Sequence, residues 1–120
     1  MTLTEKLDSI RGCLDSDTMG CDIETVVEKG KALSQLIGLS AECKAEARKE
    51  LEKARVAALT LLQVDGLAPS ILLKMVDAHC AEQIAAFEYA DRLNAGITHQ
   101  LDFYRSVISL HKTELENSLK

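Results

Sequence analysis

The fold of this chain is decided by residues 73–115, which read LKMVDAHCAEQIAAFEYADRLNAGITHQLDFYRSVISLHKTEL. Positions three and four apart form a heptad series, of which ten of the thirteen members are apolar: Leu73, Val76, Cys80, Gln83, Phe87, Ala90, Asn94, Ile97, Leu101, Tyr104, Ile108, His111 and Leu115. This spacing places apolar side chains on one stripe of an α-helix. It predicts a single long, coiled-coil-like helix over residues 68–117, with Pro69 in its first turn, where a missing N–H is harmless.

A break at residues 94–96 is the alternative, because residues 97–117 could then fold back as a separate helix. Glycine inside a helix costs only about 1 kcal/mol. The heptad phase also passes through Gly96 without slipping, and this favours a continuous helix.

Three shorter helices are expected upstream of this one. Thr2 and Glu5 have the spacing of a capping box, while Asp22 and Ser40 are suited to be N-caps. Gly38 is expected to end the second helix in the left-handed conformation. The six glycines and one proline are too few for the turns of many short strands. The fold class predicted is therefore all-α, an antiparallel bundle of about four helices. The expected helices cover residues 3–15, 23–37, 41–64 and 68–117 of a single domain that spans residues 1–120.

The charge of the chain argues against a nucleic-acid partner. Fourteen basic and 19 acidic residues give a formal net charge of -5, and residues 1–28 hold seven acids and two bases. This is the wrong sign for neutralising phosphates. The helix at 41–64 does carry a base-rich stretch, which holds Lys49 and the four residues expected to form a basic surface, Lys44, Arg48, Lys53 and Arg55. A DNA-binding accessory protein with a composite basic surface is therefore the alternative function, although interspersed glutamates cancel most of the field beyond a Debye length of about 8–10 Å.

Membrane insertion and small-molecule binding are not expected either. The longest run without a charged residue is ten positions, residues 32–41, whereas a spanning helix needs about 18–20. No basic flank leads into an apolar stretch at the N-terminus, so no secretory signal is expected. Two Phe, two Tyr and no Trp leave few stacking platforms for bases or sugars.

No metal, cofactor or catalytic centre is expected from the sequence. The cysteines, Cys13, Cys21, Cys43 and Cys80, form no C-x-x-C pair and are interpreted as small buried hydrophobic residues. The acidic stretch 15–24 partly matches a calcium loop, but Val26 stands where a bidentate Glu is required. His99 and Asp102, one turn apart, are the alternative for an oriented imidazole, yet no nucleophile accompanies them, so the chain is not expected to be an enzyme.

Helix lengths lead to the expected function. At 1.5 Å per residue the last helix would be about 75 Å long and the one before it about 36 Å. Side chains beyond about residue 92 would then stay exposed, at roughly 1.5–3 kcal/mol each, unless a second copy covers them. The oligomer seam expected is Asn94, Ile97, Leu101, Tyr104, Ile108, His111 and Leu115. Its two polar members, Asn94 and His111, either fix the register of the paired helices or lie at an edge of the seam that is partly exposed to water. The chain is thus predicted to be a non-enzymatic helical oligomerisation and interaction module that binds itself and, through its acidic N-terminal part, another protein.

A resemblance extends over residues 88–114, EYADRLNAGITHQLDFYRSVISLHKTE, with Ala68, Pro69 and Ser70 leading in. The stretch resembles a group of small helical proteins encoded in bacterial prophages. The residues that carry the resemblance are Arg92, Leu93, Asn94, Thr98, His99, Gln100, Asp102, Arg105, Ser106, Ser109 and Lys112. It implies a bacterial cytoplasm and an accessory role near phage replication or recombination genes, with no catalytic residues. Because a solvated face does not require their identities, His99 and Arg105 are the partner contacts expected here.

Overall fold

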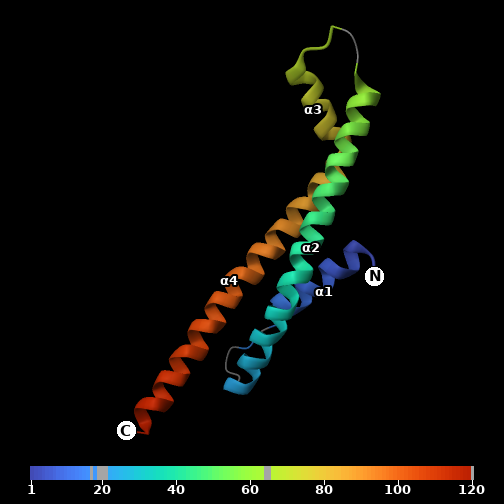
Figure 1. The fold of residues 1–120 in the computed structure, drawn as a ribbon. Helices are drawn as coiled ribbons and strands as arrows, with labels where there is room; N and C mark the ends of the chain where they lie inside the picture. Colours follow the sequence, from blue (N-terminus) through green and yellow to red (C-terminus); the bar gives the residue numbers. More distant parts are fainter. Residues whose placement is uncertain (17, 19–21, 64–65, 120) are drawn as a thin grey trace.

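A computed structural model describes residues 1–16, 18, 22–63 and 66–119. In this part of the chain all regular structure is helical, which confirms the all-α prediction. The helices are α1 (Leu3–Asp15), α2 (Ile23–Leu62), α3 (Pro69–His79) and α4 (Ala81–Ser118). Figure 1 shows α2 and α4 running antiparallel side by side, α1 lying across their middle, and α3 beside the C-terminal end of α2.

The molecule is a rod and not a sphere. Its extents are 78 × 28 × 21 Å and its radius of gyration is 20.9 Å, against about 14 Å for a compact domain of this length. The elongation follows from two helices of 40 and 38 residues that pack along each other. At 1.5 Å per residue each is about 60 Å long.

Three of the four predicted helix starts are confirmed. The Thr2 hydroxyl accepts from the Glu5 N–H at 3.1 Å, and the Glu5 carboxylate accepts from the Thr2 N–H, which completes the capping box of α1. Asp22 caps α2 by accepting from the Thr25 N–H at 2.9 Å. Pro69 occupies the first turn of α3. Each start is a local arrangement of a few residues, and the sequence specifies it fully.

The predicted break between residues 37 and 41 is wrong, because α2 continues through it without interruption. Gly38 is helical and exposed, and Gly66, at φ 88°, is the residue with positive φ in the described ranges. The hydroxyl of Ser40 does not cap a helix but accepts a hydrogen bond from the Asn94 amide at 3.2 Å. Leu33 and Cys43, on either side of the glycine, are both buried in the same core. Burying that stripe outweighs the roughly 1 kcal/mol cost of a helical glycine.

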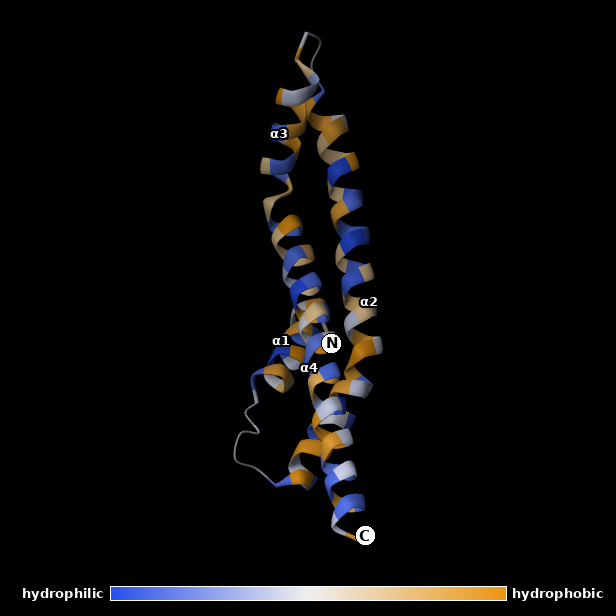
Figure 2. Ribbon diagram, turned by 90° about the vertical axis from the view of Figure 1, so that its left-hand side faces the viewer, coloured by the Kyte–Doolittle hydropathy of each residue, from blue (hydrophilic) through white to orange (hydrophobic). Residues whose placement is uncertain are grey.

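The prediction of one helix over residues 68–117 is also wrong in part. The chain leaves the helical conformation at Cys80, where φ is -100° and ψ is 18°, and α3 and α4 meet there. Cys80 is fully buried and packs in a second core cluster with Leu51, Ala58 and Val76. The break lets α3 and α4 each pack on α2, as Figure 2 shows.

The alternative break at residues 94–96 does not occur, so the favoured continuity there is confirmed. Gly96 lies inside α4 and faces α1. A Cβ at this position would lie 3.4 Å from a methyl group of Leu14. The glycine therefore lets α1 approach closely and does not mark a turn.

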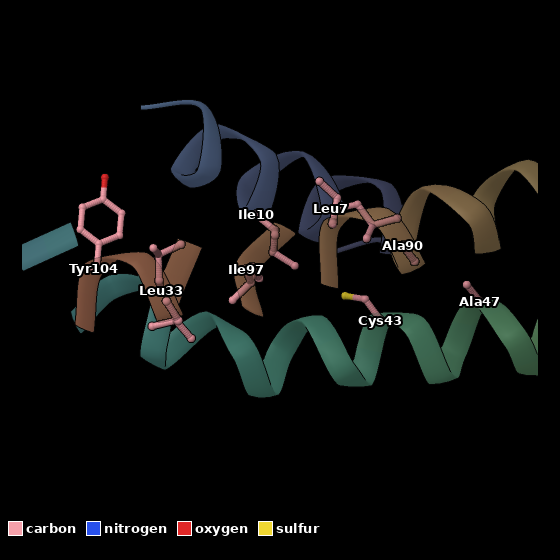
Figure 3. Packing of buried hydrophobic residues seen from close by; sticks show 10 residues of the cluster. Leu7, Ile10, Leu33, Cys43, Ala47, Ala90, Ile97 and Tyr104 are labelled. Atoms are coloured by element: carbon pink, nitrogen blue, oxygen red, sulfur yellow. The ribbon is translucent and has the colours of Figure 1, made fainter. Parts of the chain in front are cut away.

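The main core lies where α1, α2 and α4 meet (Figure 3). Its buried residues are Leu7, Ile10, Leu33, Cys43, Ala47, Ala90, Leu93, Ile97, Leu101 and Tyr104. Small side chains such as Ala47 and Ala90 alternate with large ones such as Leu33 and Ile97, which allows α2 and α4 to approach closely. Cys43 and Cys80 are buried without a disulfide, as interpreted from the sequence, and Cys13 is partly buried and also free. Cys21 lies outside the described residues.

Alanine at two glycines should have opposite effects on stability. Gly38→Ala should stabilise the protein by about 0.5–1 kcal/mol, since the position is helical and nothing lies within 4 Å of the added methyl group. Gly66→Ala should destabilise it by about 1–2 kcal/mol, because its φ of 88° is left-handed. Urea unfolding followed by circular dichroism measures both. Loss of stability in Gly38→Ala would contradict a continuous α2.

Alkaline pH should lower the free energy of unfolding, and Cys43 should account for part of this loss. Burial raises the pKa of its thiol above the ordinary value of 9.0, so the folded chain keeps this proton where the unfolded chain loses it. The contribution to stability is complete below pH 9.0 and disappears as pH rises through the folded pKa. The free energy of unfolding should therefore fall more steeply above pH 9.0 in the wild type than in Cys43→Ala. Parallel curves would contradict the raised pKa.

Candidate functional site

The first half of the predicted oligomer seam is used inside the chain. Ile97, Leu101 and Tyr104 are 0%, 2% and 6% exposed and pack in the main core. The expectation that they need a second copy to cover them is wrong, because α2 is 40 residues long and matches α4 along this stretch. Asn94, another seam position, donates a hydrogen bond from its side-chain amide to the Ser40 hydroxyl of the same chain.

The second half of the seam is less covered. Ile108 and His111 are partly buried, and a Cβ at Gly30 of α2 would lie 3.7 Å from the Ile108 side chain. Leu115 is 52% exposed. Association of copies through these remaining positions stays a prediction.

The two expected partner contacts lie on the open face of α4. His99 is exposed and makes no hydrogen bond with any residue that the structure describes. Arg105 is exposed and forms an ion pair with Asp102 of its own helix at 3.9 Å. Since Asp102 is thus directed toward Arg105, the geometry gives no support to an imidazole oriented by Asp102.

The basic residues proposed for nucleic acid are mostly engaged in ion pairs. Lys44 contacts Asp91 of α4 at 2.8 Å, and Lys53 contacts Glu50 at 3.8 Å. Arg55 is shared between Glu52 and Asp77, at 3.8 and 3.7 Å. Arg48 is exposed, and no ion pair with a described residue involves it. Most of the positive charge of these four residues is therefore neutralised by acidic side chains of the same chain.

A polar junction, formed by Lys29, Gln100 and Tyr104, lies where α1 ends and was missed by the sequence interpretation. The Lys29 ammonium donates to the Leu14 carbonyl at 3.3 Å and to the carbonyl of Ser16. The Gln100 amide also donates to the Leu14 carbonyl, at 3.0 Å. These donors from α2 and α4 satisfy the free carbonyls at the C-terminus of α1, where positive charge is favourable. The junction thus fixes α1 onto the long pair.

The other contacts of this junction are also internal to the chain. The Lys29 ammonium lies 5.5 Å from the centre of the Tyr104 ring, and the Tyr104 hydroxyl is hydrogen-bonded to Thr18 at 2.6 Å. The Gln100 carbonyl oxygen is buried without a hydrogen-bond partner in the described part of the chain. Sequence spacing gives no signal for this site, because its side chains come from α2 and α4 and the carbonyls that they bind lie at the end of α1.

A shallow, open surface pocket of about 500 Å³ lies at the start of α2, and its lining residues are Asp22, Ile23, Glu24, Thr25, Val27 and Glu28. The Asp22 carboxylate already accepts hydrogen bonds as the N-cap of α2. Hydrogen bonds from the N–H and the hydroxyl of Thr25 hold the pKa of that carboxyl below 3.8. Across the described ranges no cluster of His, Cys, Asp and Glu side chains is arranged to hold a metal ion. No described helix is both long and apolar enough to cross a membrane.

An apolar surface covers the end of the rod where α2 and α3 pack together. We call this end, residues 51–62 and 69–79, the tip. Exposed large apolar side chains on it are Val56, Leu59, Leu61, Ile71, Leu73 and Met75. The tip is two helices thick, and Figure 2 shows hydrophobic bands on both helices there. The sequence signal was the run Ile71 to Val76, which is apolar in nearly every direction around a helix.

The comparisons with known proteins add no relative. No family model matches the chain, and no similar protein was found among curated proteins or among solved structures.

Removing the ammonium of Lys29 should destabilise the protein by about 1–3 kcal/mol, since the carbonyls of Leu14 and Ser16 lose their donor. Lys29→Met keeps most of the side-chain length. The matched control is Lys31→Met, two residues along α2, where the ammonium is exposed and pairs with Glu28 at 3.6 Å. This control should cost less than about 0.5 kcal/mol. Equal losses for the two variants in urea unfolding would argue against the junction.

Proposed function

We propose that the chain is a non-enzymatic helical interaction module that associates with copies of itself. The observation that carries the proposal is the surface of α3. Five of its eleven residues are large and apolar, namely Ile71, Leu72, Leu73, Met75 and Val76, and only Val76 is buried. A helix that is apolar nearly all round is normally covered on more than one side. Here α2 covers one side of it.

The energetics support association of moderate strength. Covering a fully exposed Leu, Ile or Met side chain contributes about 1.5–3 kcal/mol. Ile71, Leu73 and Met75 are 50%, 58% and 40% exposed, so each would contribute about half of that. Association costs roughly 4–15 kcal/mol in lost freedom of motion. Several such side chains from each copy are therefore needed, and a reversible oligomer is expected.

The other functional expectations remain proposals of lower support. An accessory role in a prophage rests on the resemblance of residues 88–114, and the comparisons do not bear on it. A composite DNA-binding surface would need Lys44, Lys53 and Arg55 to leave their ion pairs. Neither is supported by a further observation.

Sedimentation velocity of the full chain over a wide concentration range tests the proposal. We expect a mass above 13.1 kDa that rises with concentration and changes little with salt, because the contacts are apolar. Salt-dependent retention on DNA would instead support the alternative. A particle of 13.1 kDa at every concentration would contradict self-association.

A further inference from the structure

We infer that α1 is a strap that detaches from the α2–α4 pair as a unit while the pair itself stays folded, and that Lys29 holds the strap in place. Ten buried residues form the main core, but only Leu7 and Ile10 among them come from α1. The other eight belong to α2 and α4, which are 40 and 38 residues long, against 13 for α1. The long pair therefore keeps most of its own packing when α1 leaves. All of these contacts lie within one copy, so the strap does not depend on the proposed self-association.

The detached state of α1 should be unfolded. Helices shorter than about 12–15 residues are marginal in water by themselves, because nucleation is costly, and α1 has 13 residues. Packing on α2 and α4 therefore supplies the stability of α1, and in the described part of the chain α1 does not pack on α3. A segment held in this way opens as one cooperative unit.

The polar contacts along the body of α1 are weak. Lys6 pairs with Glu46 of α2 at 4.0 Å, and both side chains are partly exposed, at 31% and 48%. The Arg11 guanidinium lies 6.0 Å from the centre of the Tyr89 ring. Exposed contacts of these two kinds contribute little to stability.

The buried polar contacts of α1 are at its C-terminus. Lys29 is 8% exposed, and its ammonium donates to the carbonyls of Leu14 and Ser16. The Gln100 amide also donates to the Leu14 carbonyl, at 3.0 Å. Once α1 detaches, water can solvate the ammonium and both carbonyls, so opening leaves none of them unsatisfied. Removing the ammonium therefore weakens only the docked state, in which the carbonyls are left without this donor.

Two buried cysteines distinguish opening of α1 from unfolding of the whole chain. Cys43 is 1% exposed and lies in the main core, where Figure 3 shows it on the side of α2 that faces Leu7 of α1. Cys80 is fully buried in the second cluster, and no member of that cluster belongs to α1. Detachment of α1 should therefore expose the Cys43 thiol and leave the Cys80 thiol covered.

Alkylation by N-ethylmaleimide tests the strap, with each thiol followed separately by mass spectrometry. The reference chain carries Cys13→Ala and Cys21→Ser, so that Cys43 and Cys80 are its two remaining cysteines. The initial rate at each thiol then reports how often that thiol is uncovered.

Lys29→Met in this background should accelerate alkylation of Cys43 about tenfold or more, because the carbonyls at the end of α1 lose a charged donor only in the docked state. The matched control is Lys31→Met, whose ammonium is exposed and should change the Cys43 rate less than about twofold. Equal Cys43 rates in the two variants would overturn the role of Lys29.

A substitution in α3 separates the two kinds of opening. Val76 is 2% exposed in the second cluster, so Val76→Ala should raise the equilibrium constant for global unfolding about tenfold. It should accelerate alkylation of Cys80 and leave the Cys43 rate within about twofold of the reference, since α1 and α3 share no packing in the described ranges. If Val76→Ala accelerates Cys43 as much as it raises the unfolding constant measured in urea, α1 opens only with the whole chain and the strap is overturned.

Hydrogen exchange of the reference chain supplies a measurement that needs no destabilised variant. The amides of α1 should share one opening equilibrium constant, at least about tenfold larger than that of the amides in the buried stretches of α2 and α4. Equal protection in the three helices would overturn the strap, whatever the oligomeric state of the chain.

Discussion

The antiparallel contact between α2 and α4 is the interaction on which the rest of this structure depends. It is closely packed because small residues, Cys43, Ala47 and Ala90, alternate with Leu33 and Ile97 along it. The unbroken length of α2 gives α4 a partner over most of its own length. Without that length the apolar stripe of α4 would face water.

The position of α1 follows from this pair. Two long helices leave a groove between them, and α1 fills its middle with Leu7 and Ile10. Its C-terminal carbonyls would remain unsatisfied if Lys29 and Gln100 did not donate to them. A chain with this junction has three helices at its centre and two at its tip. The difference in thickness is the reason that apolar side chains are exposed at the tip.

Charge is also distributed unevenly along the rod. The ion pairs of Lys44, Lys53 and Arg55 neutralise much of the basic stretch of α2 within the chain. Surface pairs of this kind contribute little to stability, but they leave little positive charge free for a polyanion. The formal excess of acids stays in the first 28 residues. The tip holds two acids and three bases, so it is nearly neutral, and it also carries six of the exposed large apolar side chains of the described residues.

The sequence by itself determined the helical class, the starts of α1, α2 and α3, and the apolar stripe of α4. Capping and periodicity involve residues a few positions apart, so Thr2, Asp22 and Pro69 specify their local structure without help from the rest of the chain. Only the tertiary structure decided that α2 continues through Gly38, that the helix breaks at Cys80, and that Ile97 and Leu101 face their own chain. A glycine costs about 1 kcal/mol in a helix, and burying several side chains that are far apart in sequence gains more free energy than this. Burial of that kind is a property of the assembled helices, and no local pattern contains it.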